Sequence, residues 1–270
     1  MGRQPVFWRY PSEVLTALPV PIPLRAFVAG LWTYTGQGQP HRVLPDGCLD
    51  FIFNLGSGTA TVVGPMSHAI VLPVRAGLTS FGVRFRPGHA ARFIDADASE
   101  LLDEQAKLDV LTRMAHLAER VASARDHEQR TALVTRALLD ARARTRAVDA
   151  HVERAVRLIA CATGPIAVRG LAADVGLSER QLERRFLERV GLGPKRFSRV
   201  MRFERALSLA ARRDLSQAEI AATAGYSDEP HLLRDFRALA GLPLKALQRE
   251  LTVERAHGVG FVQAEAQRMG

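Results

Sequence analysis

The sequence predicts an α+β protein in which a strand-rich N-terminal part precedes an all-α C-terminal part. Three observations lead to this prediction. Glycine, proline and short alternating apolar runs fill residues 1 to about 95, whereas Ala, Leu, Arg and Glu dominate from about Ser99 onward. Two similar helical segments then recur near the C-terminus. At 270 residues, the chain is long enough for two domains with separate cores.

The strands are predicted from alternation of apolar and other side chains. In "TSFGVRFRP", Phe81, Val83 and Phe85 alternate with polar or small residues, which places three large apolar groups on one side of a strand. The segments "CLDFIFNLG" and "TATVVGP" are typical of further strands that end at glycine turns.

Two amphipathic helices are expected next, in "ELLDEQAKLDVLTRMAHLAERVAS" and "HEQRTALVTRALLDARAR", because apolar residues recur three and four positions apart. The basic stretch 141–150, "ARARTRAVDA", then marks a boundary between domains. We therefore expect an N-terminal domain over 1–145, a helical domain over 146–253 and a loose tail over 254–270.

Composition restricts the class of protein. The net charge of +9 favours a polyanionic partner such as nucleic acid or an acidic membrane surface. Cys48 and Cys161 are too few for a disulfide framework or a zinc site, which favours a cytoplasmic protein without a metal. Prolines interrupt the apolar stretch near the N-terminus, and polar residues, glycines and prolines interrupt the uncharged run 51–74, so we expect neither a signal peptide nor a membrane span.

The helical part contains an internal repeat. "LAADVGLSERQLERRFLERVGLGP", residues 171–194, resembles "IAATAGYSDEPHLLRDFRALAGLP", residues 220–243. Gly176 and Ser178 recur 49 residues later, and Leu182 and Phe186 recur 50 residues later. One extra residue is therefore expected between the second serine, Ser227, and the leucine that follows it.

Each copy has the order of parts of a helix-turn-helix unit. An alanine-rich helix precedes a glycine turn, a serine positioned to cap, and a second helix anchored by leucine and phenylalanine. The spacer "KRFSRVMRFERALSLAARR" predicts a helix of about 27 Å, and neighbouring major grooves on one side of B-DNA are about 34 Å apart. One chain could thus place two recognition helices in neighbouring grooves.

Residues 150–250 resemble the DNA-binding domain of AraC-type transcription regulators, on the two repeated segments, the spacer "VMRFERALSLA" and the pattern "GYSD....RDF....G.P". The resemblance implies two helix-turn-helix units joined by one long helix. It also implies double-stranded DNA as partner and a role as a sequence-specific transcription regulator, possessing no enzymatic activity and no cofactor. An unidentified small-molecule effector, a homodimer through the N-terminal domain and a contact with RNA polymerase are left open.

Carried over by position, the base-facing residues of the first unit are Arg180, Gln181, Glu183 and Arg184. Helical geometry supports this, because 180, 183 and 184 lie opposite Leu182 and Phe186. Arginine can donate two hydrogen bonds to guanine, and glutamate can accept one from cytosine. Glu183 alternatively pairs with a neighbouring arginine.

In the second unit the corresponding residues are Glu229, Pro230, His231, Leu233 and Arg234. Its acidic start is repelled by phosphate, so we expect the first unit to discriminate more between bases, with Arg234 as the main reader of the second. Phosphate contacts are expected from Arg185, Lys195, Arg196, Arg199, Arg202 and Arg205, although a solvated helix face is the alternative for these residues.

The N-terminal half is similar to the sensor-like domain of a subgroup with motifs such as "RVLPDGCLDFIF" and "GVRFRPG", here residues 42–53 and 82–88. This resemblance implies a cupin-like β-barrel followed by helices, with a regulatory or dimerising role. His41, Asp46, Cys48 and Arg84 are candidates for an effector pocket, against the alternatives of turn residues and surface solvation.

Catalysis has little support in the sequence. There is no glycine-rich phosphate loop after a strand, no G-x-S-x-G segment and no H-E-x-x-H pair. Two alternatives remain beside a regulator: a ligand-binding or catalytic barrel that the helical half places on DNA, and an architectural DNA-binding protein without an effector.

Overall fold

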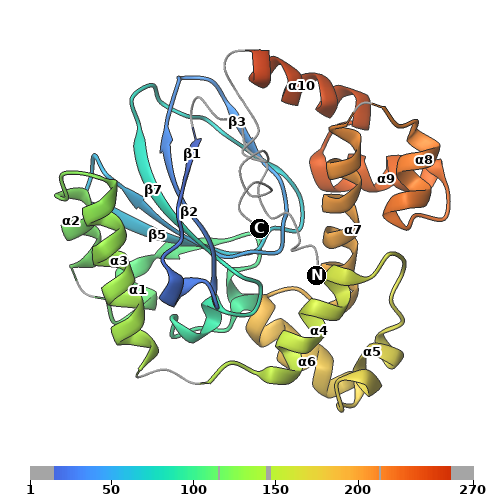
Figure 1. Ribbon diagram of the computed structural model, residues 1–270, viewed down its shortest axis with the longest axis horizontal. Helices are drawn as coiled ribbons and strands as arrows, with labels where there is room; N and C mark the ends of the chain where they lie inside the picture. The colour runs from blue at the N-terminus through green and yellow to red at the C-terminus, as the bar shows by residue number, and fades with distance from the viewer. Residues whose placement is uncertain (1–14, 115, 144–146, 213, 257–270) are drawn as a thin grey trace.

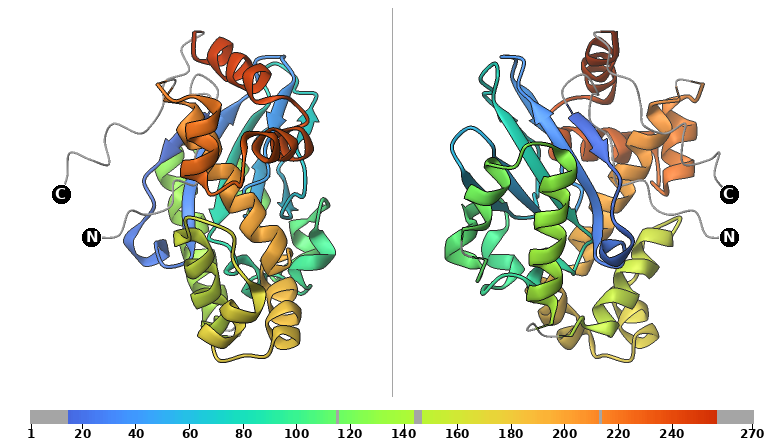
Figure 2. Two further views of the ribbon diagram at one scale, coloured as in Figure 1. Left: turned by 90° about the vertical axis from the view of Figure 1, so that its right-hand side faces the viewer. Right: turned by 60° about the vertical axis from the view of Figure 1, so that its left-hand side comes forward.

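The computed structural model describes residues 15–256 of the chain, apart from 115, 144–146 and 213. A β-sheet carries helices on one face, and a helical domain lies on its other side (Figures 1 and 2). None of the helices within these residues is long and apolar enough to cross a lipid bilayer.

The main sheet has six antiparallel strands in the order β1-β2-β7-β4-β5-β8. Their bounds are β1 (Leu15–Leu18), β2 (Val28–Thr35), β4 (Asp50–Asn54), β5 (Thr59–Val63), β7 (Thr79–Phe85) and β8 (Gln105–Lys107). Two short strands, β3 (His41–Val43) and β6 (Ile70–Leu72), pair with each other. The strands expected in "CLDFIFNLG", "TATVVGP" and "TSFGVRFRP" are thus confirmed.

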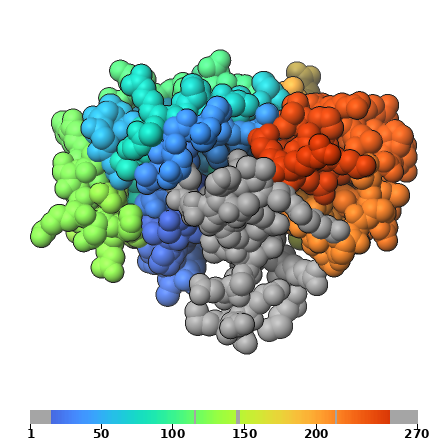
Figure 3. Space-filling view, turned by 90° about the horizontal axis from the view of Figure 1, so that it is seen from above, coloured from blue at the N-terminus to red at the C-terminus, as the bar shows by residue number. Residues whose placement is uncertain are grey.

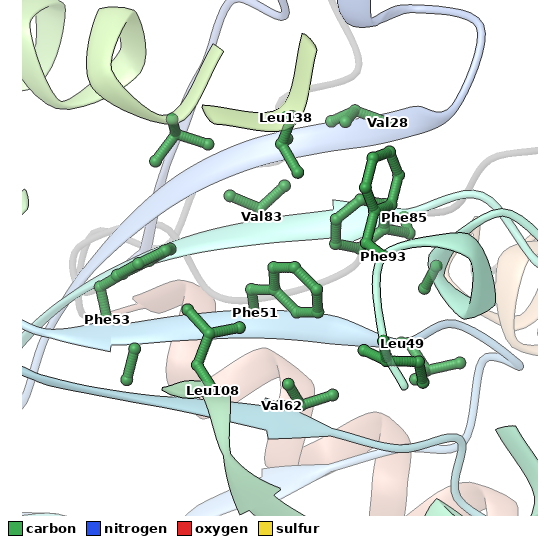
Figure 4. Packing of buried hydrophobic residues seen from close by; sticks show 14 of the residues in the cluster. Val28, Leu49, Phe51, Phe53, Val62, Val83, Phe85, Phe93, Leu108 and Leu138 are labelled. Atoms are coloured by element: carbon green, nitrogen blue, oxygen red, sulfur yellow. The ribbon is translucent and has the colours of Figure 1, made fainter. Parts of the chain in front are cut away.

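The expected barrel does not close within the described residues, because β1 and β8 are the two edges of an open sheet. Helices cover its apolar face instead of a second sheet. Phe51, Phe53, Val83 and Phe85 pack there against Leu138 of α3 (His127–Arg142) and neighbouring residues (Figure 4). Alternation along a strand predicts an apolar face but does not determine what covers it.

The helix expected over 100–123 is wrong, and the helix expected in "HEQRTALVTRALLDARAR" is confirmed as α3 (His127–Arg142). The described residues between 98 and 122 include η3 (Ala98–Leu101), β8, α1 (Leu108–Leu111) and α2 (Leu117–Ala122). Asp103 has a left-handed φ of 58° that stops a helix, and residues 105–107 pair with the edge of β5. Sheet pairing therefore prevails over the local helical pattern.

Seven helices follow, beginning eight residues after α3 ends at Arg142. They are α4 (Ala150–Cys161), α5 (Val168–Asp174), α6 (Glu179–Val190), α7 (Pro194–Ala210), α8 (Gln217–Ala224), α9 (Glu229–Ala240) and α10 (Leu244–Ala256). Of the tail expected over 254–270, residues 257–270 lie outside the described residues. Two further short turns of 3-10 helix are η1 (Ile22–Leu24) and η2 (Ala90–Arg92).

The helical domain has two apolar cores that meet along α7. The N-terminal half of α7, through Phe197, Val200 and Met201, shares one core with α4, α5 and α6. Its C-terminal half, from Phe203 to Ala210, shares the other with α8, α9 and α10. The long helix thus connects two packed units (Figure 1).

Candidate nucleic-acid interface

The first unit consists of α5, a glycine turn and α6. Gly176 has a φ of 71°, in the left-handed region that glycine enters most easily. The Ser178 hydroxyl accepts from the Gln181 backbone N–H at 3.3 Å, and the Gln181 side chain accepts from the Ser178 backbone N–H at 3.0 Å. This reciprocal cap fixes where α6 begins. Leu182, Phe186 and Val190 then anchor α6 in the core.

The second unit, α8 and α9, has the same order but a different cap. Gly225 has a φ of 86° and allows the turn. The residue that caps α9 is Asp228, whose carboxylate accepts from the His231 N–H at 2.6 Å. This hydrogen bond and one from Ser227 lower the pKa of Asp228. Ser227, expected to cap by its correspondence with Ser178, instead donates to Asp228 at 3.0 Å. The extra residue of the second copy therefore lies before its cap.

The outer face of α6 carries the predicted base-facing residues. Arg180, Gln181, Glu183 and Arg184 are exposed, on the side opposite the buried Leu182 and Phe186. Arg184 pairs with Glu188 one turn further along, with 2.7 Å between Nη1 and Oε1. Because this ion pair is accessible to solvent, Arg184 can exchange Glu188 for another hydrogen-bond acceptor at little cost in free energy.

Two of these four side chains have a second role. The Gln181 amide is engaged in the cap of α6. The Glu183 carboxylate lies against Gly193, the residue that precedes α7. A carboxylate at a helix N-terminus is favoured by the helix dipole. In this structure Glu183 accordingly supports the junction between α6 and α7, and no ion pair joins it to an arginine among the described residues.

The outer face of α9 is less cationic. Arg234 is exposed, Glu229, His231 and Leu233 are half-buried, and Pro230 is exposed. The His231 ring lies edge-on to Tyr226 with centroids 5.1 Å apart, and its Nδ1 is 3.1 Å from the Ser227 hydroxyl. His231 therefore covers the start of α9, and Leu233 packs against the second core.

The arginines and the lysine expected to contact phosphate divide into two groups. Lys195 and Arg196 are exposed at the start of α7 and have no ion pair within the described residues. Arg185 instead pairs at 3.2 Å with Asp149, which caps α4. Arg199 and Arg202 pair with Asp235 of α9. With Arg205, which bridges α8 and α4, four of the six expected phosphate contacts therefore also hold helices together.

Asp235 on α9 has a structural role that the sequence did not reveal. Its side chain is buried, and it accepts from Arg199 Nε at 2.8 Å, with Arg202 Nη2 at 3.7 Å. The Arg202 guanidinium also lies over the Tyr226 ring at 4.9 Å, and burial raises the pKa of Tyr226. An aspartate on the apolar face of α9 was the available signal, because a buried charge requires a partner. This cluster ties α9 to α7.

Arg205 has a comparable role between the two units. Its guanidinium donates to the carbonyls of Ala224 at 3.4 Å and Ala160 at 3.3 Å, near the ends of α8 and α4. Cations stabilise the carbonyl ends of helices. Burial lowers the pKa of this guanidinium, but arginine stays charged at neutral pH.

Three of the four effector-pocket candidates come together, and they are buried. Arg84 Nη1 pairs with Asp46 at 2.7 Å and Arg84 Nη2 pairs with Asp50 at 2.7 Å, while the Cys48 N–H donates to Asp46 at 2.9 Å. Burial raises the pKa of Asp46 and that of the Cys48 thiol. His41 lies apart on β3, with its ring 5.7 Å from that of Tyr34.

A cleft of about 890 Å³ lies elsewhere, between the strand-rich domain and α6. Apolar residues from 91–96, α2 and α3 line it. Charged side chains of both signs line it as well, namely Arg92, Arg113, Arg120, Arg189, Asp95, Asp97, Glu100 and Asp140. Arg189 belongs to α6, so this cleft borders the recognition helix of the first unit. None of the four candidates from the sequence lines this cleft.

Two family models match the chain. Residues 171–250 match a helix-turn-helix domain, which covers both units described above. Residues 17–107 match a domain of unknown function, DUF6597, which spans the strands. The C-terminal part is therefore a helix-turn-helix domain, as the repeat predicted.

Among curated proteins, the chain is 34% identical over 79 residues to the HTH-type transcriptional regulator GbdR of Pseudomonas aeruginosa. The match covers 29% of this chain and 22% of that protein, so the chain spans about a fifth of its length. A helix-turn-helix transcriptional regulator is thus among the proteins to which part of this chain is similar.

Three solved structures illustrate the similarity of this chain to known proteins. An AraC-type DNA-binding protein from Chromobacterium violaceum is 26% identical over 37% of this chain and 91% of its own, with a TM-score of 0.35. The DNA-binding domain of AdpA, in complex with a target DNA, is 25% identical. The match covers 41% of this chain and 99% of that domain, with a TM-score of 0.37. ToxT from Vibrio cholerae is 8% identical. The match covers 84% of this chain and 94% of ToxT, with a TM-score of 0.44.

Proposed function

We propose that this chain is an AraC-type, sequence-specific transcription regulator that inserts α6 and α9 into successive major grooves of DNA. The observation that carries the proposal is the pair of capped helix-turn-helix units on one continuous helix. The 17 residues of α7 span about 25 Å, and a turn at each end brings the separation toward the 34 Å or so between grooves.

Base recognition is assigned first to Arg180 and Arg184 on α6, since both are exposed and can donate two hydrogen bonds to guanine. Arg234 is the corresponding residue of α9. Gln181, Glu183, Glu229 and His231 are assigned an indirect role in recognition. Gln181, Glu229 and His231 lie where α6 and α9 begin, and Glu183 lies where α6 joins α7. Lys195 and Arg196 are assigned to phosphate, because both cations are exposed beside α6.

The proposal is tested by measuring the affinity of the purified chain for a library of double-stranded sites. Arg184→Ala is expected to relax preference at one or two positions at a cost of about 1–3 kcal/mol. Arg196→Ala, the matched control on α7, is expected to weaken all sites alike and to reduce the salt dependence. Unselective binding by the unmodified chain, or equal effects of the two variants, would contradict the assignment.

Effector control is the second part of the proposal. The N-terminal half resembles a sensor-like domain, and the cleft of about 890 Å³ lies between it and the Arg189 end of α6. This volume is typical of small-molecule sites. We further propose action in the cytoplasm, with a second copy of the chain and RNA polymerase as protein partners. A ligand screen by thermal shift, repeated on an Arg120→Ala variant, tests the cleft.

A further inference from the structure

The strand-rich domain and the helical domain meet at the buried loop that carries Asp46 and Cys48. Residues Leu44–Cys48, hereafter the 44–48 loop, connect β3 to β4, and all five are buried. Their sequence, "LPDGC", is typical of an exposed turn. Their burial means that something packs on them, and that partner is α7.

Gly47 brings the backbone of the loop directly onto α7. It has a left-handed φ of 74°, and a Cβ atom built on it would lie 2.6 Å from Cε2 of Phe197 and 3.6 Å from Cε of Met201. A side chain at this position would therefore be strained in the backbone and would collide with a buried ring. The loop and the helix fit together only because this residue is glycine.

The loop contacts both halves of the helical domain. Phe197 belongs to the core of the first unit, with its ring centroid 5.5 Å from that of Phe186 on α6. Leu44, three residues before Gly47, is part of the core of the second unit together with Phe203 and Phe236. The 44–48 loop thus lies on α7 where the two cores meet.

The loop is held rigidly from the sheet. Arg84, on the central strand β7, is only 5% exposed in its side chain and pairs with Asp46 of the loop and Asp50 of β4, each at 2.7 Å. Asp46 also accepts the Cys48 N–H at 2.9 Å, which closes the turn. A buried charge held by two partners fixes geometry, because any displacement leaves a charge unpaired.

Contacts with α6, α9 and α10 complete the connection. Arg42 pairs with Glu250 of α10 at 2.9 Å and donates to the Ala240 carbonyl at 3.1 Å, and the Ala69 N–H donates to the Leu239 carbonyl at 2.7 Å. Figure 3 shows α10 against the strand region. Gly191, which ends α6, faces the Ala98 carbonyl. The strand-rich domain therefore contacts the C-terminal ends of both recognition helices.

We infer that the 44–48 loop is a specificity-determining joint: by fixing α7 it sets the relative orientation of α6 and α9, and with it the spacing of the two DNA elements that the chain recognises. The inference rests on the proposed DNA recognition. It assigns the strand-rich domain a direct part in the choice of site, through shape and without contact to a base.

Gly47→Ala tests the joint, and Gly77→Ala is its matched control. Gly77 also has a left-handed φ, of 76°, but a Cβ there would meet nothing within 4 Å. Both substitutions add the same methyl group and a similar backbone strain. Only Gly47→Ala presses on Phe197, so the difference between the variants isolates the contact with α7.

The first measurement is hydrogen–deuterium exchange of the full chain, which requires no DNA. Amides of α7 around residues 197–201 are expected to exchange faster in Gly47→Ala than in Gly77→Ala. Where Gly47→Ala fails to fold, Leu44→Ala serves instead, because it removes the side chain that enters the second core. Equal exchange along α7 in loop variant and control overturns the inference.

The second measurement uses DNA sites in which zero, one or two base pairs are inserted between the two recognised elements. The unmodified chain and Gly77→Ala are expected to prefer one spacing, and this preference is expected to fall about fivefold or more in Gly47→Ala. An unchanged preference would refute the inference. If the unmodified chain discriminates between no sites at all, the proposed function fails first, and the two failures are thus distinguishable.

Discussion

The arginines of the helical domain differ in what they contact, although a helical wheel treats them alike. Arg180 and Arg196 are exposed and have no acidic partner among the described residues, whereas Arg199 and Arg202 face the buried Asp235. The first kind is available to DNA. The second kind stabilises the packing of α9 on α7, and Asp235 is the acidic residue on which this packing depends.

Replacing Asp235 by Ala is therefore expected to lower the free energy of unfolding by about 3 kcal/mol, because it leaves Arg202 buried without its anion. Urea denaturation followed by circular dichroism measures the loss. Asp214→Ala is the control, since the Asp214–Arg212 pair is exposed and its removal should change stability by less than about 0.5 kcal/mol. Similar losses in the two variants would show that Asp235 is not the tie between α7 and α9.

At the scale of single elements, the two units are alike in order and different in their caps. Ser178 and Gln181 cap α6 reciprocally, while Asp228 alone caps α9 and Ser227 stands outside the helix. Both devices satisfy orphan N–H groups at a helix start. The second unit therefore depends on one carboxylate.

Asp228→Ala is accordingly expected to lower the thermal unfolding midpoint by roughly 2–4 °C, and Ser227→Ala by clearly less. Thermal unfolding midpoints of both variants, measured at neutral pH where Asp228 is ionised, compare the two positions. A larger effect of Ser227→Ala would mean that the cap lies where the repeat alone placed it.

The elements that sequence reasoning predicted well are those with long periodic patterns. Leu182 and Phe186, four residues apart and repeated 50 residues later, define α6 and α9. By contrast, β8 is a three-residue edge strand inside a helix-like window, and only its pairing with β5 makes it a strand. Strand alternation likewise could not reveal that helices would replace the second wall of a barrel.

The candidate site followed the same rule. The exposed position of Arg180 and Arg184 followed from helical spacing, because it depends on one helix alone. The pairing of Arg199 with Asp235, and of Arg84 with Asp46, depends on where separate elements meet. Such partners become evident only in three dimensions.

At the scale of the whole molecule, His89 lies at the start of η2 near α4 of the helical domain. It is 6% exposed, and its Nδ1 has no hydrogen-bond partner among the described residues. Burial lowers the pKa of His89 from 6.5; Glu153 of α4 opposes this, and Arg86, Arg92 and Arg157 add to it. The folded state thus holds this proton less tightly than the unfolded state.

Stability is consequently expected to fall as pH drops below about 6.5 toward the lowered pKa, since the unfolded chain takes up the proton first, by up to about 1.4 kcal/mol per pH unit. Urea unfolding between pH 7.5 and 5.5 measures this slope. His89→Leu, which keeps an apolar group of similar size, should flatten it. Identical slopes in the unmodified chain and the variant would exclude His89 as the source.

The continuity of α7 between the two cores limits the insertions and deletions that the chain can accept. Each residue inserted into an α-helix rotates everything beyond it by about 100° and moves it by about 1.5 Å. One residue inserted within Pro194–Ala210 would rotate the second unit away from the DNA groove adjacent to the one that the first unit faces. It would also remove Leu44 from the core of the second unit. Insertions and deletions are therefore expected to be tolerated in the 73–78 turn but not in α7, because the length of this helix sets the relative orientation of the two units.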